Sequence, residues 1–151
     1  MGSGQFVYLD PRDADRKCAP DAFVKLDAKH ELFDTWKTWE RGTPELCAEI
    51  VSPSDREKQT LEEKLERFHA MGVAEVVALD PDADAGSRLR AWDLVEGDLV
   101  ERVVEADATP CLTLGLWFVV APAPLNELAH ALRLAEDASA RVVVPTSKAS
   151  P

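Results

Sequence analysis

Short apolar runs alternate with charged loops along most of the chain. Three of these runs have the length of a strand: residues 22–26, 46–51 and 75–79. Each is bounded by proline, glycine or charged residues, which is typical of buried strands. In the second run, LCAEIV, side chains alternate between the two faces of a strand, so Cys47, Glu49 and Val51 share one face.

Between the second and third runs the apolar residues change to helical spacing. They recur at intervals of four, three and three residues, at Leu61, Leu65, Phe68 and Met71. Ser54 followed three residues later by Glu57 is a capping-box pattern, and Gly72 is a typical helix end. The pattern predicts an amphipathic helix from near Asp55 to Met71.

The other segments complete a mixed pattern. Before the second run we expect a charged loop at 10–17 and loop with short strand at 27–45. After the third run we expect a β-hairpin of 88–94 and 99–104 joined through Glu96-Gly97. One or two strands at 111–120 and a short helix at 125–138 follow. A strand–helix–strand unit at the centre predicts a mixed α/β sheet. We assign residues 1–140 to a single domain and expect 141–151 to be a flexible tail.

Three polar residues lie where the periodicity predicts apolar ones. Glu49 is in the middle of an apolar strand, where a carboxylate costs several kcal/mol unless it is paired or binds a cation. Asp21 opens the preceding strand directly after a proline. Lys64 falls inside the apolar stripe of the helix, between Phe68 and Met71.

Two carboxylates and one amine facing a core suggest a small polar site. Carboxylate oxygens suit Mg²⁺, and substrate phosphate often completes its coordination. A lysine beside such a metal can orient a water and stabilise charge on a phosphate. The periodicity by itself favours a structural interpretation, in which Glu49 and Lys64 form an ion pair at a sheet edge or the lysine reaches solvent.

Composition and charge narrow the classes of function. The chain has 151 residues, of which 46% are hydrophobic and 30% charged, and this excludes a mainly disordered protein. Its net charge of -11 disfavours nucleic-acid binding through a broad positive surface. No apolar run is long enough to cross a membrane. We expect no secretory signal, because residues 1–9 have neither a basic region nor an apolar core. Three separated cysteines without a CxxC motif are typical of a cytoplasmic protein.

Two segments, APDAFVKL (19–26) and PELCAEIVSPSDREKQTLEEKLERFHAMGVAEVVALDPD (44–82), resemble the Uma-type restriction endonucleases of the PD-(D/E)XK nuclease superfamily. That family has Pro-Asp before a strand, a Glu-Val/Ile-x-Ser-Pro-Ser block, a helix of the form K-x-x-x-Y-x-x-x-G-V, and Glu-Tyr-Trp leading to Asp-Pro. Here the matching residues are Pro20-Asp21, Glu49 to Ser54, Lys64, Phe68, Gly72-Val73, Glu75 and Asp80-Pro81. Thr60 stands at a helix position that is often acidic in the family.

The resemblance implies a restriction-endonuclease-like mixed sheet with flanking helices, N-terminally shortened relative to the family. It also implies hydrolysis of DNA phosphodiesters with Mg²⁺ or Mn²⁺. By position, Asp21 and Glu49 would bind the metal, and the backbone carbonyl of Ile50 would be a further ligand. Lys64 would be the catalytic lysine, because Val51 occupies its usual position on the strand. A homodimer would cover an exposed sheet edge.

The same residues are compatible with functions besides an endonuclease. A catalytically degenerate relative that acts as a binding or assembly module is the main alternative, and an acidic protein-interaction domain is a weaker one. We expect packing rather than base stacking for Trp36 and Trp39, and a solvated position for His69. Cys47 and Cys111 are expected to be core residues.

Overall fold

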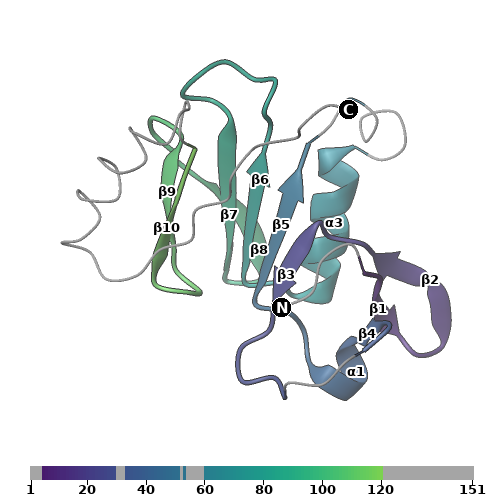
Figure 1. Cartoon of the computed structure of the whole chain (residues 1–151). Coiled ribbons are helices and arrows are strands. Elements are labelled where there is room, and N and C mark those ends of the chain that lie inside the picture. The colour runs from purple at the N-terminus through teal and green to yellow at the C-terminus, as the bar shows by residue number, and fades with distance from the viewer. Residues whose placement is uncertain (1–4, 30–32, 52, 54–59, 121–151) are drawn as a thin grey trace.

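A twisted five-stranded sheet forms the centre of the molecule (Figure 1). The computed structural model describes residues 5–29, 33–51, 53 and 60–120. The strands are β1 (Val7–Asp10), β2 (Asp13–Cys18), β3 (Ala22–Val24), β4 (Trp36–Lys37), β5 (Leu46–Ile50), β6 (Glu75–Leu79), β7 (Leu89–Val95), β8 (Asp98–Arg102), β9 (Ala108–Cys111) and β10 (Leu116–Val119). The helices are α1 (Thr38–Arg41) and α3 (Leu61–Met71).

The strand order of the central sheet is β3-β5-β6-β7-β8. β5 and β6 are parallel and are connected through α3, whereas the other neighbours are antiparallel. Two smaller sheets accompany it, with the orders β2-β1-β4 and β10-β9. The predicted mixed α/β sheet is therefore confirmed, and the strand predicted at 75–79 has the same bounds as β6.

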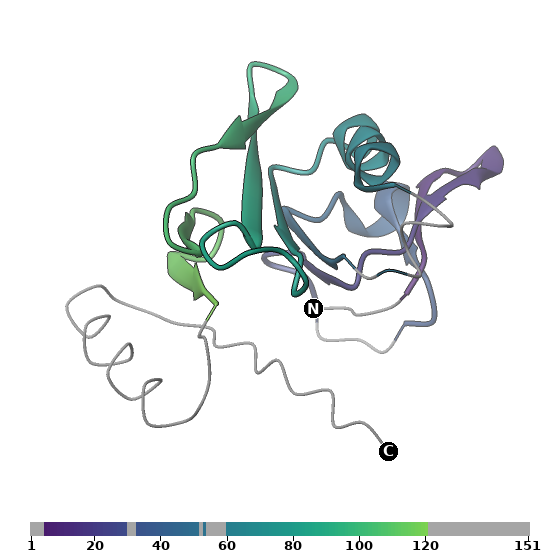
Figure 2. The same ribbon diagram turned by 90° about the horizontal axis from the view of Figure 1, so that it is seen from above.

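The two faces of the sheet are covered by different elements. On one face, Cys47 of β5 packs in a core with Phe68 of α3, and Val51 lies against this core. On the opposite face, Leu46 packs with Cys111 of β9 in a second core. Figure 2 shows α3 and the β9–β10 hairpin on opposite sides of the sheet. The alternation read from LCAEIV is thus confirmed, and it turns Glu49 toward the helix.

Helix α3 begins later than the spacing predicted. Its N-cap is Thr60, whose hydroxyl accepts from the Glu63 amide while the Glu63 carboxylate accepts from the Thr60 amide. This capping box satisfies amides that the first helical turn leaves unpaired, so the helix starts at Leu61 and not near Asp55. The pair predicted to cap it, Ser54 and Glu57, lies outside the described residues.

The C-terminal end of α3 agrees with the prediction. Gly72 adopts a left-handed conformation with φ 78°, and its amide donates to the carbonyl of His69. Glycine reaches this conformation at little cost, so the chain can turn directly from α3 toward β6.

The hairpin predicted around Glu96 and Gly97 is also confirmed. Both residues have positive φ, 51° and 95°, as a two-residue hairpin turn requires, and they join β7 to β8. The run 111–120 contains β10 and the last residue of β9, which begins earlier, at Ala108.

The prediction of a loop at 10–17 is wrong. Residues Val7–Asp10 and Asp13–Cys18 form an antiparallel hairpin. The first four residues of β2 are exposed, so its sequence DADR carries no apolar alternation and the strand cannot be recognised from hydrophobicity. The predicted helix at 125–138 and tail at 141–151 lie outside the described residues. Among the residues described, no helix is long and apolar enough to span a membrane.

Candidate active site

Glu49 is a buried carboxylate in the middle of β5. It is only 2% exposed, and in the parallel register it lies beside Ala78 of β6. Its Oε2 accepts a hydrogen bond from Nζ of Lys64 at 2.7 Å. Its Oε1 is buried and has no hydrogen-bond partner among the described residues. A buried carboxylate oxygen left in this state costs free energy, and either protonation of the carboxyl or a bound ligand would relieve that cost.

Lys64 reaches this carboxylate from the facing helix. It lies in the second turn of α3, on the side that buries Phe68 and Met71 against the sheet. The Lys64 side chain is 18% exposed, so its stem is covered while its amine meets Glu49. The expectation that Lys64 belongs to the buried stripe of the helix is confirmed, and the reading in which it only reaches solvent is excluded.

Asp21 approaches the same point from the neighbouring strand. Pro20 is fully buried and holds the chain just before β3, which pairs antiparallel with β5. Oδ2 of Asp21 accepts a hydrogen bond from the backbone amide of Ile50 at 2.7 Å. Asp21 itself is exposed. The bond therefore fixes a solvent-facing carboxylate one residue along β5 from Glu49.

The surroundings make Glu49 a weak acid. Burial raises the pKa of Glu49 to about 7, the Lys64 amine opposes this shift, and the neighbouring Asp21 carboxyl adds to it. Ala22 pairs with Ala48, so Asp21, the residue before Ala22, lies beside Glu49 at the end of β3. The three side chains that the sequence singled out therefore lie near one another, joined by the bonds from Lys64 to Glu49 and from the Ile50 amide to Asp21.

The donor set suits a hard divalent cation. One of the two carboxylates has a buried oxygen that no described residue satisfies. One or two carboxylates are the ligands that Mg²⁺ commonly takes from a protein, while water and substrate phosphate supply the rest. No cluster of three or more His, Cys, Asp or Glu residues with metal-binding geometry occurs within the described ranges. The backbone of Ile50 contacts Asp21 through its amide, and the role predicted for the Ile50 carbonyl stays a prediction.

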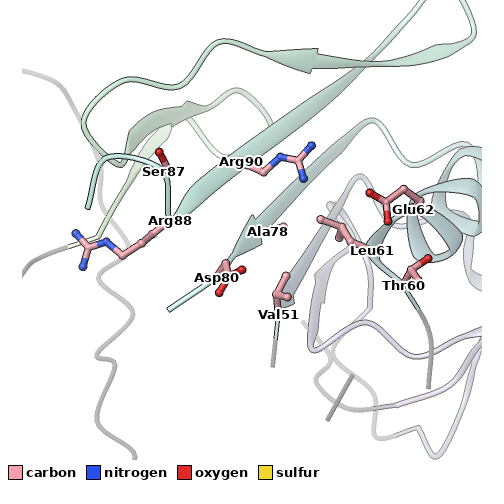
Figure 3. Close-up of a pocket in the computed structure, with 9 residues that line it drawn as sticks. All are labelled: Val51, Thr60, Leu61, Glu62, Ala78, Asp80, Ser87, Arg88 and Arg90. Carbon is pink, nitrogen blue, oxygen red and sulfur yellow. The ribbon is translucent and has the colours of Figure 1, made fainter. Parts of the chain in front are cut away.

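A hollow of about 310 Å³ lies next to these residues on the α3 face of the sheet (Figure 3). Ala78, which neighbours Glu49, forms part of its floor, and Leu61, one turn before Lys64, forms part of its wall. The hollow thus adjoins the carboxylate–lysine site, although Asp21, Glu49 and Lys64 are not among the residues that line it. The described residues that line it are Val51, Thr60, Leu61, Glu62, Ala78, Asp80, Ser87, Arg88 and Arg90.

A second buried carboxylate, Glu75, lies on the opposite face of the sheet. It is 1% exposed and accepts from Arg102 Nη2 at 3.0 Å and from the amides of Leu112 and Thr113 at 3.0 and 2.9 Å. Burial alone would raise the pKa of Glu75, but these amides and the guanidinium lower it. Its oxygens are already satisfied, so Glu75 ties the β9–β10 hairpin to the sheet. In the sequence, a glutamate at the start of an apolar strand was the feature that could have indicated a buried carboxylate.

The other candidates agree with the sequence predictions except Trp39, which is exposed although packing was expected. His69 is largely exposed and contacts the carbonyl of Gly97. Trp36 is 3% exposed and packs edge-on against Phe23, so it is a core residue, whereas Trp39 is 42% exposed. The two strand cysteines, Cys47 and Cys111, are fully buried.

The fold and the site define a mixed α/β domain with an acidic pair and a lysine at the centre of its sheet. A protein-family model described as "Uma2: Putative restriction endonuclease" matches residues 2–123. The chain therefore belongs to this family. A search of curated proteins found no match.

Proposed function

We propose that this protein is a divalent-metal-dependent DNA endonuclease whose site consists of Asp21, Glu49 and Lys64. One observation supports it above all: among the described residues, one oxygen of the buried Glu49 has no hydrogen-bond partner, and it lies beside the Lys64 amine and the Asp21 carboxyl. A carboxylate kept only for stability would have both oxygens satisfied, as those of Glu75 are.

In this proposal, Asp21 and Glu49 hold Mg²⁺ or Mn²⁺, and the Ile50 carbonyl is a further ligand. When bound, the cation would polarise the scissile phosphate and lower the pKa of the attacking water. Glu49 must lose its proton to act as a ligand, and the ammonium of Lys64 stabilises the resulting carboxylate. The Ile50 amide orients Asp21 through the bond at 2.7 Å.

Lys64 has a second role in the proposal. Its amine is held at the edge of the site by Glu49 Oε2, at 2.7 Å. From there it can align the attacking water and donate to a phosphate oxygen as negative charge develops. A substitution that shortens this side chain should therefore affect the rate of cleavage more than the affinity for DNA.

The alternative is a catalytically degenerate relative that serves as a binding or assembly module. Two observations favour it. Thr60, at the position that is often acidic in the family, is used as the cap of α3, and the described residues offer only two carboxylates at the site. In that case the contact between Glu49 and Lys64 would be a structural ion pair.

Plasmid nicking under titration with Mg²⁺ or Mn²⁺ tests the proposal. The wild type should nick DNA only with metal, and Glu49→Gln and Lys64→Ala should each lose at least about a hundredfold in rate. Glu66→Gln is the matched control, because Glu66 lies on the exposed side of the same helix. Cleavage that survives both site substitutions would overturn the assignment. No cleavage together with no metal binding in calorimetry would establish the alternative.

A further inference from the structure

The hollow beside the acidic site has an arginine on its far side. Ala78 of β6 pairs with Glu49 on one side and with Arg90 on the other, so the three residues form one row across the sheet. Strands are spaced about 4.8 Å apart, which places the backbones of Glu49 and Arg90 about 10 Å apart. Ala78 and Arg90 both line the hollow, so the hollow lies over the part of this row that is next to Glu49.

Arg90 is positioned over this space by its neighbours on the sheet. Its guanidinium carbon lies 4.8 Å from the ring centroid of Trp92, which is itself buried. Figure 3 shows the Arg90 side chain extending toward Glu62 of α3, whereas that of Arg88, which also lines the hollow, extends in the opposite direction. Arg88 also forms an ion pair with the buried Asp107, at 2.8 Å, so its role is structural.

Arg90 forms an ion pair with Glu101 that a phosphate can replace. Its Nε and Nη2 atoms donate to the two oxygens of Glu101 at 2.7 and 3.0 Å, and both side chains are nearly half exposed. Exposed ion pairs of this kind contribute only about 0–1 kcal/mol. The same pair of donors fits two oxygens of a phosphate, which makes a charge-assisted bidentate contact.

We propose that Arg90 binds a backbone phosphate of the substrate strand next to the phosphate at Asp21 and Glu49, with the hollow as the binding subsite. This inference rests on the proposed endonuclease function. The ligand class is a nucleic-acid phosphodiester, recognised by charge and not by base sequence. Because Glu62 and Asp80 also face the hollow, a phosphate there is repelled unless Arg90 is present. Loss of Arg90 should therefore matter more than loss of an ordinary surface arginine.

Fluorescence anisotropy with labelled duplex DNA tests this subsite, with Ca²⁺ in place of Mg²⁺ to hold the DNA uncleaved. Arg90→Gln should weaken binding about tenfold, equally for unrelated sequences, and lower the slope of log K against log salt concentration by about 0.9. Glu101→Gln releases Arg90 and should tighten binding about two- to fivefold. Arg12→Gln, which removes an exposed arginine paired with Asp10 on the β1–β2 hairpin, should change neither quantity.

The outcomes separate the subsite from the nuclease assignment. If Arg90→Gln and wild type bind and cleave alike while Glu49→Gln is inactive, the subsite is overturned and the endonuclease stands. If wild type never cleaves but its binding depends on Arg90, the subsite stands and the endonuclease fails. Since Arg90 covers Trp92, Arg90→Lys, which keeps the aliphatic stem and the charge but not the bidentate donors, should bind with intermediate affinity at an unchanged melting temperature.

Discussion

Lys64 Nζ lies 2.7 Å from Oε2 of Glu49, and it joins a helix to the strand that it covers. The contact connects residues 15 positions apart in the chain. It brings an amine against a carboxylate that is 2% exposed and whose pKa is about 7. Both the chemistry and the stability of the site therefore depend on the charge state of Glu49.

Metal affinity should rise steeply with pH. The pKa of Glu49 is raised to about 7, so below this pH the group carries a proton that a cation must displace. Between about pH 6 and 7 the affinity for Mg²⁺ should rise by up to about tenfold per pH unit and then level off by about pH 8. Calorimetry in buffers of different ionisation enthalpy should detect release of up to about one proton at about pH 6. An affinity that is flat over this range would contradict the role of Glu49.

The unfolding free energy should respond to pH in the opposite direction when metal is absent. The native pKa of Glu49 lies above its ordinary value of 4.5, so the folded protein binds more protons than the unfolded chain between these values. The stabilising contribution is complete below pH 4.5 and is lost as the pH rises through about 7. Urea titrations of wild type and Glu49→Gln at about pH 5 and about pH 8 measure this effect. From the lower to the higher pH, the unfolding free energy of Glu49→Gln should increase relative to that of wild type.

Lys64→Ala should destabilise the protein far more at about pH 8 than at about pH 5. At the higher pH it leaves an ionised carboxylate buried without its partner, which costs about 3 kcal/mol. At the lower pH Glu49 is protonated and the loss should be about 1 kcal/mol. The double variant Glu49→Gln/Lys64→Ala removes the charge and should recover most of the stability at the higher pH. A loss from Lys64→Ala that is the same at both pH values would show that only packing was removed.

Thr60→Ala should destabilise α3 by about 1 kcal/mol, because the first helical turn loses the hydroxyl that accepts from the Glu63 amide. Thr60→Asp keeps an acceptor at the cap and restores an acidic residue at this position, and it should retain stability. Thermal unfolding measures both variants. An unchanged melting temperature in Thr60→Ala would show that the cap does not hold the helix.

Glu75→Gln should affect stability and leave metal binding intact. Glu75 accepts from Arg102 and from two backbone amides on the face opposite α3, so glutamine in its place offers one acceptor oxygen fewer to these buried donors. Arg102 keeps its ion pair with Asp93, so the expected cost in urea unfolding is about 2 kcal/mol. Calorimetry at a temperature where the variant is folded should give wild-type affinity for Mg²⁺. If Glu75→Gln lost as much metal affinity as Glu49→Gln, Glu75 would contribute to metal binding from the opposite face of the sheet, which would contradict the prediction.

The sequence predicts a helix or strand correctly where the residues of that element themselves form a recognisable pattern. The hairpin at Glu96-Gly97 was recognisable because two residues of positive φ leave a clear signature. The strand Asp13–Cys18 was not, because its first four residues are exposed and lack apolar alternation. The start of α3 was placed too early because Ser54 and Thr60 both have the residue types of a cap, and the spacing alone does not choose between them.

By itself the sequence determined that Glu49 turns to the covered face of its strand and that Lys64 lies in the buried stripe of its helix. These properties follow from periods of about two and 3.6 residues, which act locally. Only the tertiary structure decided that the two groups meet, that Glu75 is satisfied by Arg102, and that Ala78 and Arg90 line a hollow next to Glu49. Such contacts join residues far apart in the chain, so they depend on strand register and on the placement of the crossover helix, which no local pattern specifies.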